Sequence, residues 1–141
     1  MLDNTLAAVD RVAVGTVALT ARAVSEVGAD LTLAQWRVLV IVGEGRDGAT
    51  VKEIALRLGA RPSPTSRLVG RLRRRDLVTS ARDDPDGRFT RVRLTESGRR
   101  LRSDVLVRRE RYFREVLAAV GQVPLDTTTL DRLASALEPF S

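Results

Sequence analysis

The 141-residue chain contains no cysteine and no histidine. The lack of cysteine excludes disulfide bridges, thiolate metal sites and redox sensing through a thiol. Without either residue type, the usual zinc sites and the Ser-His and Cys-His catalytic pairs cannot be assembled from this chain. Carboxylate, lysine and tyrosine chemistry stays open in principle, but the sequence holds no recognisable cluster of such groups. We therefore predict that the protein is not an enzyme and needs no cofactor or metal.

Long hydrophobic runs are also missing. The longest, over residues 38–42, is far shorter than a membrane span. Residues 1–8 lack the basic and then apolar segments of a signal peptide. With 43% hydrophobic and 30% charged residues, the chain has the composition of a soluble globular domain. We expect a single folding unit over residues 1–141 that is cytoplasmic and has no membrane partner.

The formal net charge of +6 is concentrated in one segment. Between Arg61 and Arg93 there are ten arginines and four aspartates, whereas the rest of the chain has fourteen basic and fourteen acidic residues. Such a local excess is typical of a surface that binds a polyanion. Chance clustering is the alternative explanation, because the basic residues are nearly all arginine and Lys52 is the single lysine.

The first part of the chain has the patterns of two helices. Asp3 is the predicted cap of a helix that extends to about Glu26, with an apolar stripe wider than one small domain needs. A second, short helix begins after Thr32, which forms a capping box with Gln35. Its apolar run ends at two glycines, so we expect the helix to be almost entirely buried.

A pair of short helices follows, and the second of them is basic. Thr50 and Glu53 form another capping box, and Gly59 supplies the usual left-handed helix stop. Ser63 is the predicted N-cap of the next helix, which has a proline as its first residue and runs to about Arg75. Two short helices with a tight connection, the second one basic, make the helix-turn-helix arrangement of DNA-binding proteins.

The remaining patterns predict a β-hairpin and two more helices. Strands are expected over Val78–Ala81 and Arg88–Leu94, joined by a charged turn that contains proline and Asp-Gly. Thr95 should cap a long helix that ends near Gly121. A last short helix opens around Pro124 and Asp126 and carries leucines at helical spacing.

The fourth helix has two different faces. Thr65, Leu68, Val69 and Leu72 lie on one arc, which must pack against the preceding helices. The opposite arc has the side chains that bind base edges and phosphates: Ser63, Ser66, Arg67, Gly70 and Arg74, with Arg71 at its margin. For this helix alone, the simpler reading is a solvated surface. The basic hairpin that follows in the sequence favours DNA.

The hairpin resembles a wing that lies beside the recognition helix. We predict that Arg88, near its tip, inserts into the minor groove. Asp84 and Asp86 make best sense as partners that hold Arg82 or Arg88 in place. The complete set of predicted DNA-contacting residues is Ser63, Thr65, Ser66, Arg67, Gly70, Arg71, Arg74, Arg82, Asp86, Arg88 and Arg91.

The order of elements resembles the MarR family of bacterial regulators over almost the whole chain. The most specific stretch is Leu72–Gly98, where L-x-x-x-x-L-V is followed by R-D-D-P-D-G-R and V-R-L-T-E-S-G. In this likeness Asp86 and Arg88 match the family's wing Asp-x-Arg. Leu94-Thr95 and Gly98 match its junction between the wing and the long helix.

The chain departs from the family at two positions. Asp76 stands where glycine is common, which raises the cost of a left-handed helix end. Gly70 replaces what is often an acidic residue and lowers the helix propensity. The resemblance also implies a small-molecule effector bound between the dimer helices and the DNA-binding lobe, although the sequence does not identify it.

The sequence thus predicts a mainly α fold with a small β-hairpin. A winged helix-turn-helix lobe over residues 32–94 is flanked by dimerisation helices over 1–30 and 96–141. Their excess apolar surface predicts a homodimer. The candidate contacts between subunits are Leu6, Val9, Val116, Leu117, Leu130, Leu133 and Leu137.

The predicted function is sequence-specific binding of double-stranded DNA by a transcriptional regulator, most simply a repressor. Its operator is expected to be pseudo-palindromic, with half-sites about 34 Å apart. The alternative function is a winged-helix protein–protein interaction module whose basic face meets an acidic partner.

Overall fold

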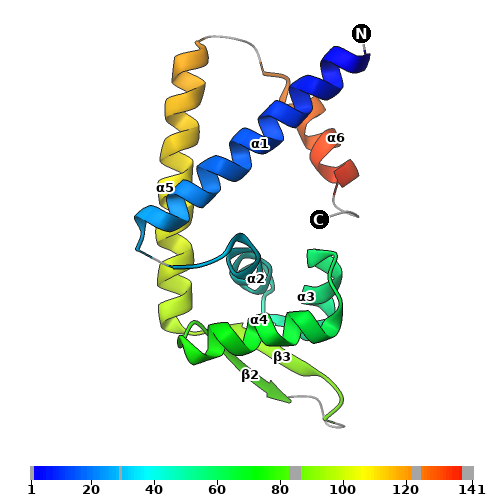
Figure 1. Ribbon diagram of the computed structural model, residues 1–141, viewed down its shortest axis with the longest axis vertical. Helices are drawn as coiled ribbons and strands as arrows, with labels where there is room; N and C mark the ends of the chain where they lie inside the picture. The colour runs from blue at the N-terminus through cyan, green and yellow to red at the C-terminus, as the bar shows by residue number, and fades with distance from the viewer. Residues whose placement is uncertain (1, 29, 83–86, 122–124, 138–141) are drawn as a thin grey trace.

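The computed structural model describes residues 2–28, 30–82, 87–121 and 125–137 (Figure 1). Two long helices, α1 (Leu2–Glu26) and α5 (Glu96–Val120), pack against each other. The remaining elements in chain order are α2 (Leu33–Glu44), β1 (Ala49–Thr50), α3 (Val51–Leu58), α4 (Pro62–Arg74), β2 (Val78–Arg82), β3 (Thr90–Leu94) and α6 (Thr127–Leu137). None of the described helices is both long and apolar enough to cross a membrane.

The elements from α2 to β3 form a compact lobe at one end of the molecule. In Figure 1, α4 and the β2–β3 hairpin lie at the lower end, whereas α6 and the N-terminal half of α1 lie toward the upper end. The predicted division into a winged lobe and dimerisation helices stays a prediction. The mainly α fold is confirmed.

The sheet has three antiparallel strands in the order β1-β3-β2, one more than the sequence predicts. Strand β1 has only two residues, and Ala49 pairs with Val92 of β3. Gly48, at a φ of 76°, permits this approach, because a β-carbon there would lie 2.0 Å from the carbonyl oxygen of Val92. A two-residue strand next to a capping box leaves no alternating pattern to detect.

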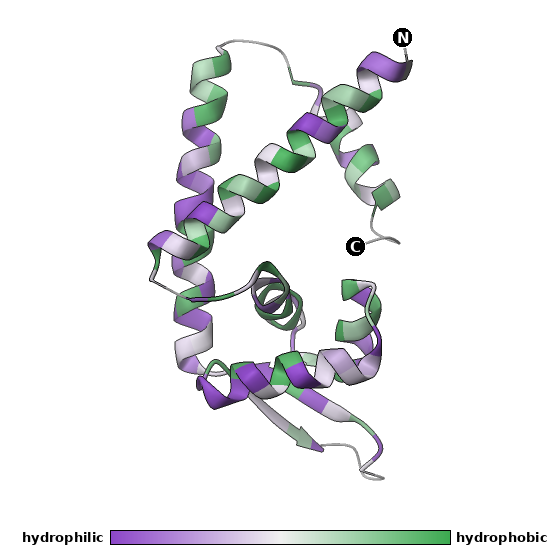
Figure 2. Cartoon of the chain, in the orientation of Figure 1, coloured by the Kyte–Doolittle hydropathy of each residue, from purple (hydrophilic) through white to green (hydrophobic). Residues whose placement is uncertain are grey.

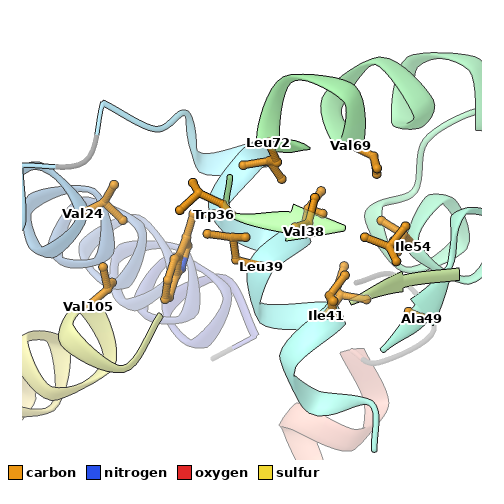
Figure 3. Close-up of a cluster of buried hydrophobic side chains, with 14 of the residues drawn as sticks. Val24, Trp36, Val38, Leu39, Ile41, Ala49, Ile54, Val69, Leu72 and Val105 are labelled. Carbon is orange, nitrogen blue, oxygen red and sulfur yellow. The ribbon is translucent and has the colours of Figure 1, made fainter. Parts of the chain in front are cut away.

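The core of the lobe forms around α2, as expected from its apolar run. Val38 and Leu39 are fully buried, together with Ile54 of α3 and Leu72 of α4 (Figure 3). Trp36 lies in the same hydrophobic cluster as Val24 of α1 and Val105 of α5, which joins the lobe to the two long helices. The neighbouring helices thus bury the side chains that project from several sides of α2.

Both predicted capping boxes are confirmed. The Thr32 hydroxyl accepts a hydrogen bond from the Gln35 amide at 3.2 Å, and the Gln35 side chain accepts one from the Thr32 amide at 2.9 Å. Thr50 and Glu53 make the same pair of bonds at 3.2 and 2.7 Å. Gly59 ends α3 in the left-handed conformation, with a φ of 62°. These contacts satisfy amide groups that a helix leaves unpaired at its start.

Two predicted helix starts are wrong. Helix α1 begins at Leu2, so Asp3 lies inside its first turn instead of capping it. Helix α4 begins at Pro62, with Arg61 as an N-cap that makes no side-chain hydrogen bond. Ser63 is therefore a residue of the first turn. Proline is well suited to the first helical position because its fixed φ is already helical and it has no amide hydrogen to satisfy.

The end of α4 is tied to the beginning of α5. Asp76 has a φ of 56°, and the amide of Leu77 donates to the carbonyl of Leu72 at 3.0 Å, which confirms the expected left-handed helix stop. The Thr95 amide then donates to Leu77 at 3.1 Å, and its hydroxyl donates to the carbonyl of Asp76 at 2.6 Å. Gly98 lies so close that a β-carbon there would be 2.0 Å from the Leu77 carbonyl oxygen.

A polar cluster around Glu26 joins the end of α1 to α5. The Tyr112 hydroxyl donates to the Glu26 carboxylate, and Arg22 and Arg108 approach it at 2.8 and 3.2 Å. The hydrogen bonds from Tyr112 and then Arg22 lower the pKa of Glu26 from 4.5 to about 2. The carboxylate is thus held ionised by groups on both helices.

Candidate nucleic-acid interface

Helix α4 presents a polar face to solvent, as the sequence predicts. Its inner face is formed by the buried residues Thr65, Val69 and Leu72. Its outer residues Ser63, Ser66, Arg67, Arg71 and Arg74 are exposed, and Gly70 is partly exposed. Figure 2 shows the contrast between α2, which is mostly hydrophobic, and α4, which has many hydrophilic residues.

Thr65 does not belong to this outer face, so its assignment as a DNA-contacting residue is wrong. The residue is fully buried, and its hydroxyl donates to the carbonyl of Arg61 at 2.9 Å. This bond satisfies the Thr65 hydroxyl within the first turn of α4, where the N-cap Arg61 makes no side-chain hydrogen bond. The Thr65 side chain stabilises the start of the helix and has no surface available for a ligand.

Five arginines at and after the middle of α4 differ in their environments. The guanidinium groups of Arg71 and Arg74, like that of Arg67 one turn earlier, form no hydrogen bond or ion pair with any residue that the structure describes. Arg73 instead donates to the Ser80 hydroxyl at 3.4 Å, and Arg75 donates to the carbonyl of Asp30 at 2.5 Å. The outward arginines therefore retain their charge for an external partner.

The hairpin packs beside α4 and adds exposed basic residues to the same end of the molecule (Figure 1). Arg82 ends β2 and Arg88 precedes β3, and both are exposed. Asp84 and Asp86 lie outside the described residues, so their expected role in holding these arginines stays a prediction. Exposed Phe89 follows Arg88 at the start of the returning segment.

Arg91 and Arg93 are directed toward Asp47 and not toward the exposed arginines. Arg93 makes two hydrogen bonds to the Asp47 carboxylate, at 2.8 and 3.0 Å, and Arg91 lies 3.9 Å from it. Arg93 is the main reason that the pKa of Asp47 is below its usual value. Some arginines of the basic segment thus lie on the outer surface, whereas Arg91 and Arg93 are paired with a carboxylate of the same chain. Sequence reasoning missed Asp47 because no local spacing connects residues 46 positions apart.

The long helices and α6 expose a second, apolar surface at the other end of the molecule. Helix α6 has no buried residue, although Leu130, Leu133 and Leu137 lie at helical spacing and are 40–51% exposed. Leu6, Val116 and Leu117 are also exposed, while Val9 is partly buried. The residues predicted for dimerisation are therefore largely uncovered within one chain.

Comparison with known proteins shows a likeness to one family. A family model described as MarR family matches residues 29–88. A structure from Rhodococcus sp. RHA1, titled as a transcriptional regulator of the MarR family, superposes with a TM-score of 0.74 and 26% identity, covering 97% of this chain and 92% of that one. Residues 29–88 are thus similar to the MarR family, and the chain shares the fold of this MarR-family structure.

Two other proteins that this chain resembles have more specific names. The HTH-type transcriptional repressor IacR of Pseudomonas putida is 38% identical over 69 residues, which are 49% of this chain and 41% of IacR. This match therefore spans less than half of the curated relative. CouR from Rhodococcus jostii RHA1, solved with bound p-coumaroyl-CoA, has a TM-score of 0.72 and 28% identity, with 93% of this chain and 87% of CouR covered.

The structure also has a cavity of about 330 Å³ between α1, α2 and α5. Thr16, Val17 and Thr20 line it from α1, Trp36 and Val40 from α2, and Arg109 from α5. The guanidinium group of Arg109 lies over the ring of Phe113 at 5.1 Å, and its buried Nε has no hydrogen-bond partner among the described residues. Its lining comes from separate helices, so sequence periodicity gives no signal for it.

Proposed function

We propose that this protein is a transcriptional repressor that binds a specific double-stranded DNA site as a homodimer. The observation that carries the proposal is the outer face of α4, whose arginines at 67, 71 and 74 have no described partner and lie at the same end as Arg82 and Arg88. The match of residues 29–88 to the MarR family model and the name of the repressor IacR support it.

In this proposal α4 enters the major groove. Ser63, Ser66 and Arg67, on its first two turns, read base edges, because arginine can bind guanine in a bidentate manner and serine can donate or accept. Gly70 lets the helix backbone approach the DNA closely. Arg71 and Arg74 bind phosphates and fix the position of the helix.

The hairpin acts as a wing beside the same site. Arg88 enters the minor groove, where narrow A·T-rich tracts have a strongly negative potential. Arg82 binds the adjacent backbone, and Asp86 holds Arg88 in its binding conformation. Arg91, half-buried beside Asp47, has at most a supporting role at the edge of this surface.

Two subunits associate through the exposed apolar residues of α1, α5 and α6. Two-fold symmetry places the recognition helices about one turn of DNA apart, roughly 34 Å, so the operator is a pseudo-palindrome. Residues 32–94 then form the DNA-binding lobe, and residues 1–30 and 96–141 form the dimerisation part.

A small molecule relieves repression by binding in the cavity between α1, α2 and α5. Apolar walls and the unsatisfied Arg109 favour an effector with an apolar body and one anionic group. CouR, with its bound coenzyme A thioester, shows that a related protein takes an acyl-aromatic ligand. Binding favours a dimer whose recognition helices no longer match the operator spacing.

The test begins with selection of bound sequences from a random duplex pool, followed by gel shifts over a range of salt concentrations. The expected result is a palindromic site whose affinity falls steeply with salt. Arg88→Ala should weaken operator binding about tenfold or more, with melting temperature and dimerisation unchanged. Arg114→Ala, exposed on α5 far from the wing, is the matched control.

Two results would contradict the proposal. Unaltered operator affinity in Arg88→Ala would remove the minor-groove role of the wing. Failure to retain any duplex, together with salt-dependent binding to an acidic protein, would favour the protein–protein interaction module.

A further inference from the structure

A second cavity, of about 540 Å³, lies on the lobe between the end of α2 and the beginning of α5. We propose that it is a binding site for a phosphorylated small molecule, separate from the effector cavity described above. It is lined by Val42, Gly43, Gly45, Arg46, Asp47, Gly48, Arg93, Leu94, Arg99 and Arg102. No residue of α4 is among these, so the cavity is not part of the outer face of α4.

The charges around this cavity do not cancel. Four arginines face one carboxylate, that of Asp47, which is already engaged by Arg93. Arg99 is also occupied, because it donates to the carbonyl of Leu94 at 2.9 Å and pairs with Glu96 at 3.1 Å. The charges of Arg46 and Arg102 are not compensated by any described carboxylate.

Arg102 is held in place without a partner. Its Nε is buried and makes no hydrogen bond with the described part of the chain. The side chain lies directly on Gly43, where a β-carbon would be only 2.5 Å from that Nε. A glycine at this position thus makes room for the guanidinium group against α2. Arg46, on the exposed turn, likewise forms no hydrogen bond or ion pair with a described side chain.

These features select the class of ligand. A planar guanidinium group matches the oxygens of a phosphate, and a phosphate monoester has a charge close to −2 at neutral pH, which suits two uncompensated arginines better than a single carboxylate does. The three glycines have no side chains to fill the cavity, and Val42 and Leu94 add apolar surface for the rest of the ligand. The volume is within the range of sites for small ligands.

The test is a calorimetric titration of the full chain with pyrophosphate, at constant ionic strength and without DNA. Arg102→Met keeps the aliphatic part of the side chain and should reduce the affinity at least about tenfold, if the charge contributes as a typical charge-assisted contact does. Arg100→Met, two positions away and 72% exposed, should have no effect. Gly43→Ala should also reduce the affinity, because the guanidinium group must move.

Arg46→Met lies on an exposed turn and should weaken binding too, which keeps the test valid if Arg102→Met does not fold. The proposal fails if the unmodified protein does not bind millimolar pyrophosphate, or if Arg100→Met and Arg102→Met lose affinity equally. It also fails if Arg102→Met lowers only the melting temperature, since the residue would then serve the end of α2 alone. Weaker duplex binding by Arg102→Met without pyrophosphate would assign the cavity to DNA phosphate. Because the titration contains no DNA, its result does not depend on the proposed repressor function.

Discussion

Gly70 of α4 and Gly98 of α5 should respond in opposite ways to the same substitution. A β-carbon at Gly70 would meet only the terminal nitrogen of Arg74, at 3.8 Å, whereas one at Gly98 would lie 2.0 Å from the backbone oxygen of Leu77. Gly70→Ala should therefore stabilise the fold by up to about 1 kcal/mol through helix propensity. Gly98→Ala should destabilise it by about 1–3 kcal/mol or more.

Urea unfolding measures both changes. Duplex binding then separates the effect of Gly70 on helix stability from its proposed role at the DNA. A Gly70→Ala variant that is more stable but binds duplex less tightly would mean that the DNA backbone approaches this position. A gain of stability in Gly98→Ala would contradict the close contact between the start of α5 and Leu77.

Individual residues also show where sequence reasoning succeeds and where it stops. The left-handed conformation of Asp76 is predictable because helix ends of this kind need a residue that tolerates positive φ. Thr65 lies on the inner arc by helical geometry alone, so its inclusion among DNA contacts conflicts with its own spacing. The pair of Asp47 and Arg93 depends on the approach of β1 to β3, which no local pattern specifies.

At the scale of elements, the attachment of α1 to α5 through Glu26 predicts a dependence of stability on pH. The ionised carboxylate is stabilised in the folded state, since its pKa is lowered from 4.5 to about 2 by Tyr112 and Arg22. The stabilisation of the fold by the ionised Glu26 carboxylate is therefore fully present above pH 4.5 and is lost as the pH falls toward 2.

Glu26→Gln should melt at a lower temperature than the unmodified protein at pH 7, and the difference should shrink as the pH is lowered through this range. Circular dichroism melts at several pH values provide the measurement. Glu110→Gln, in an exposed pair with Arg114 on the same helix face of α5, should show little effect at any pH. A constant difference for Glu26→Gln down to pH 2 would exclude the carboxylate's charge as its origin.

Element boundaries were predictable where a side chain marks them. The capping boxes at Thr32 and Thr50 specify the starts of α2 and α3, and Thr95 specifies that of α5, because each satisfies amide groups of the first turn. Helix α4 has no such marker, so the prediction chose Ser63 over the true start. Strand β1 was missed because its pairing, and not its own sequence, makes it a strand.

For the whole molecule, the uncovered leucines of α6 predict that the chain forms a dimer. Leu133→Asp should convert the dimer to a monomer, because it places a charge in an apolar contact between subunits. Sedimentation equilibrium measures this change. Leu56→Asp is the matched control, since Leu56 is 80% exposed on α3 but lies outside the predicted dimer contacts. Loss of the dimer in both variants, or in neither, would contradict the assignment.

The overall architecture was therefore accessible from the sequence, since capping, apolar periodicity and the wing pattern agree with one another. The two cavities were not, because each forms between helices or turns that are distant along the chain. The uncovered apolar face of α6, in contrast, was accessible from the sequence. Its residues could be predicted as exposed only because the rest of the chain offers no surface to cover them.

The joint at Asp76, Leu77 and Thr95 has a mechanical consequence for a dimer. Asp76 and Leu77, directly after α4, accept hydrogen bonds from Thr95, the N-cap of α5, so the end of α4 and the start of α5 are coupled at this point. In a dimer, a change in the angle between the long helices of two subunits would pass through this connection and alter the distance between the two copies of α4.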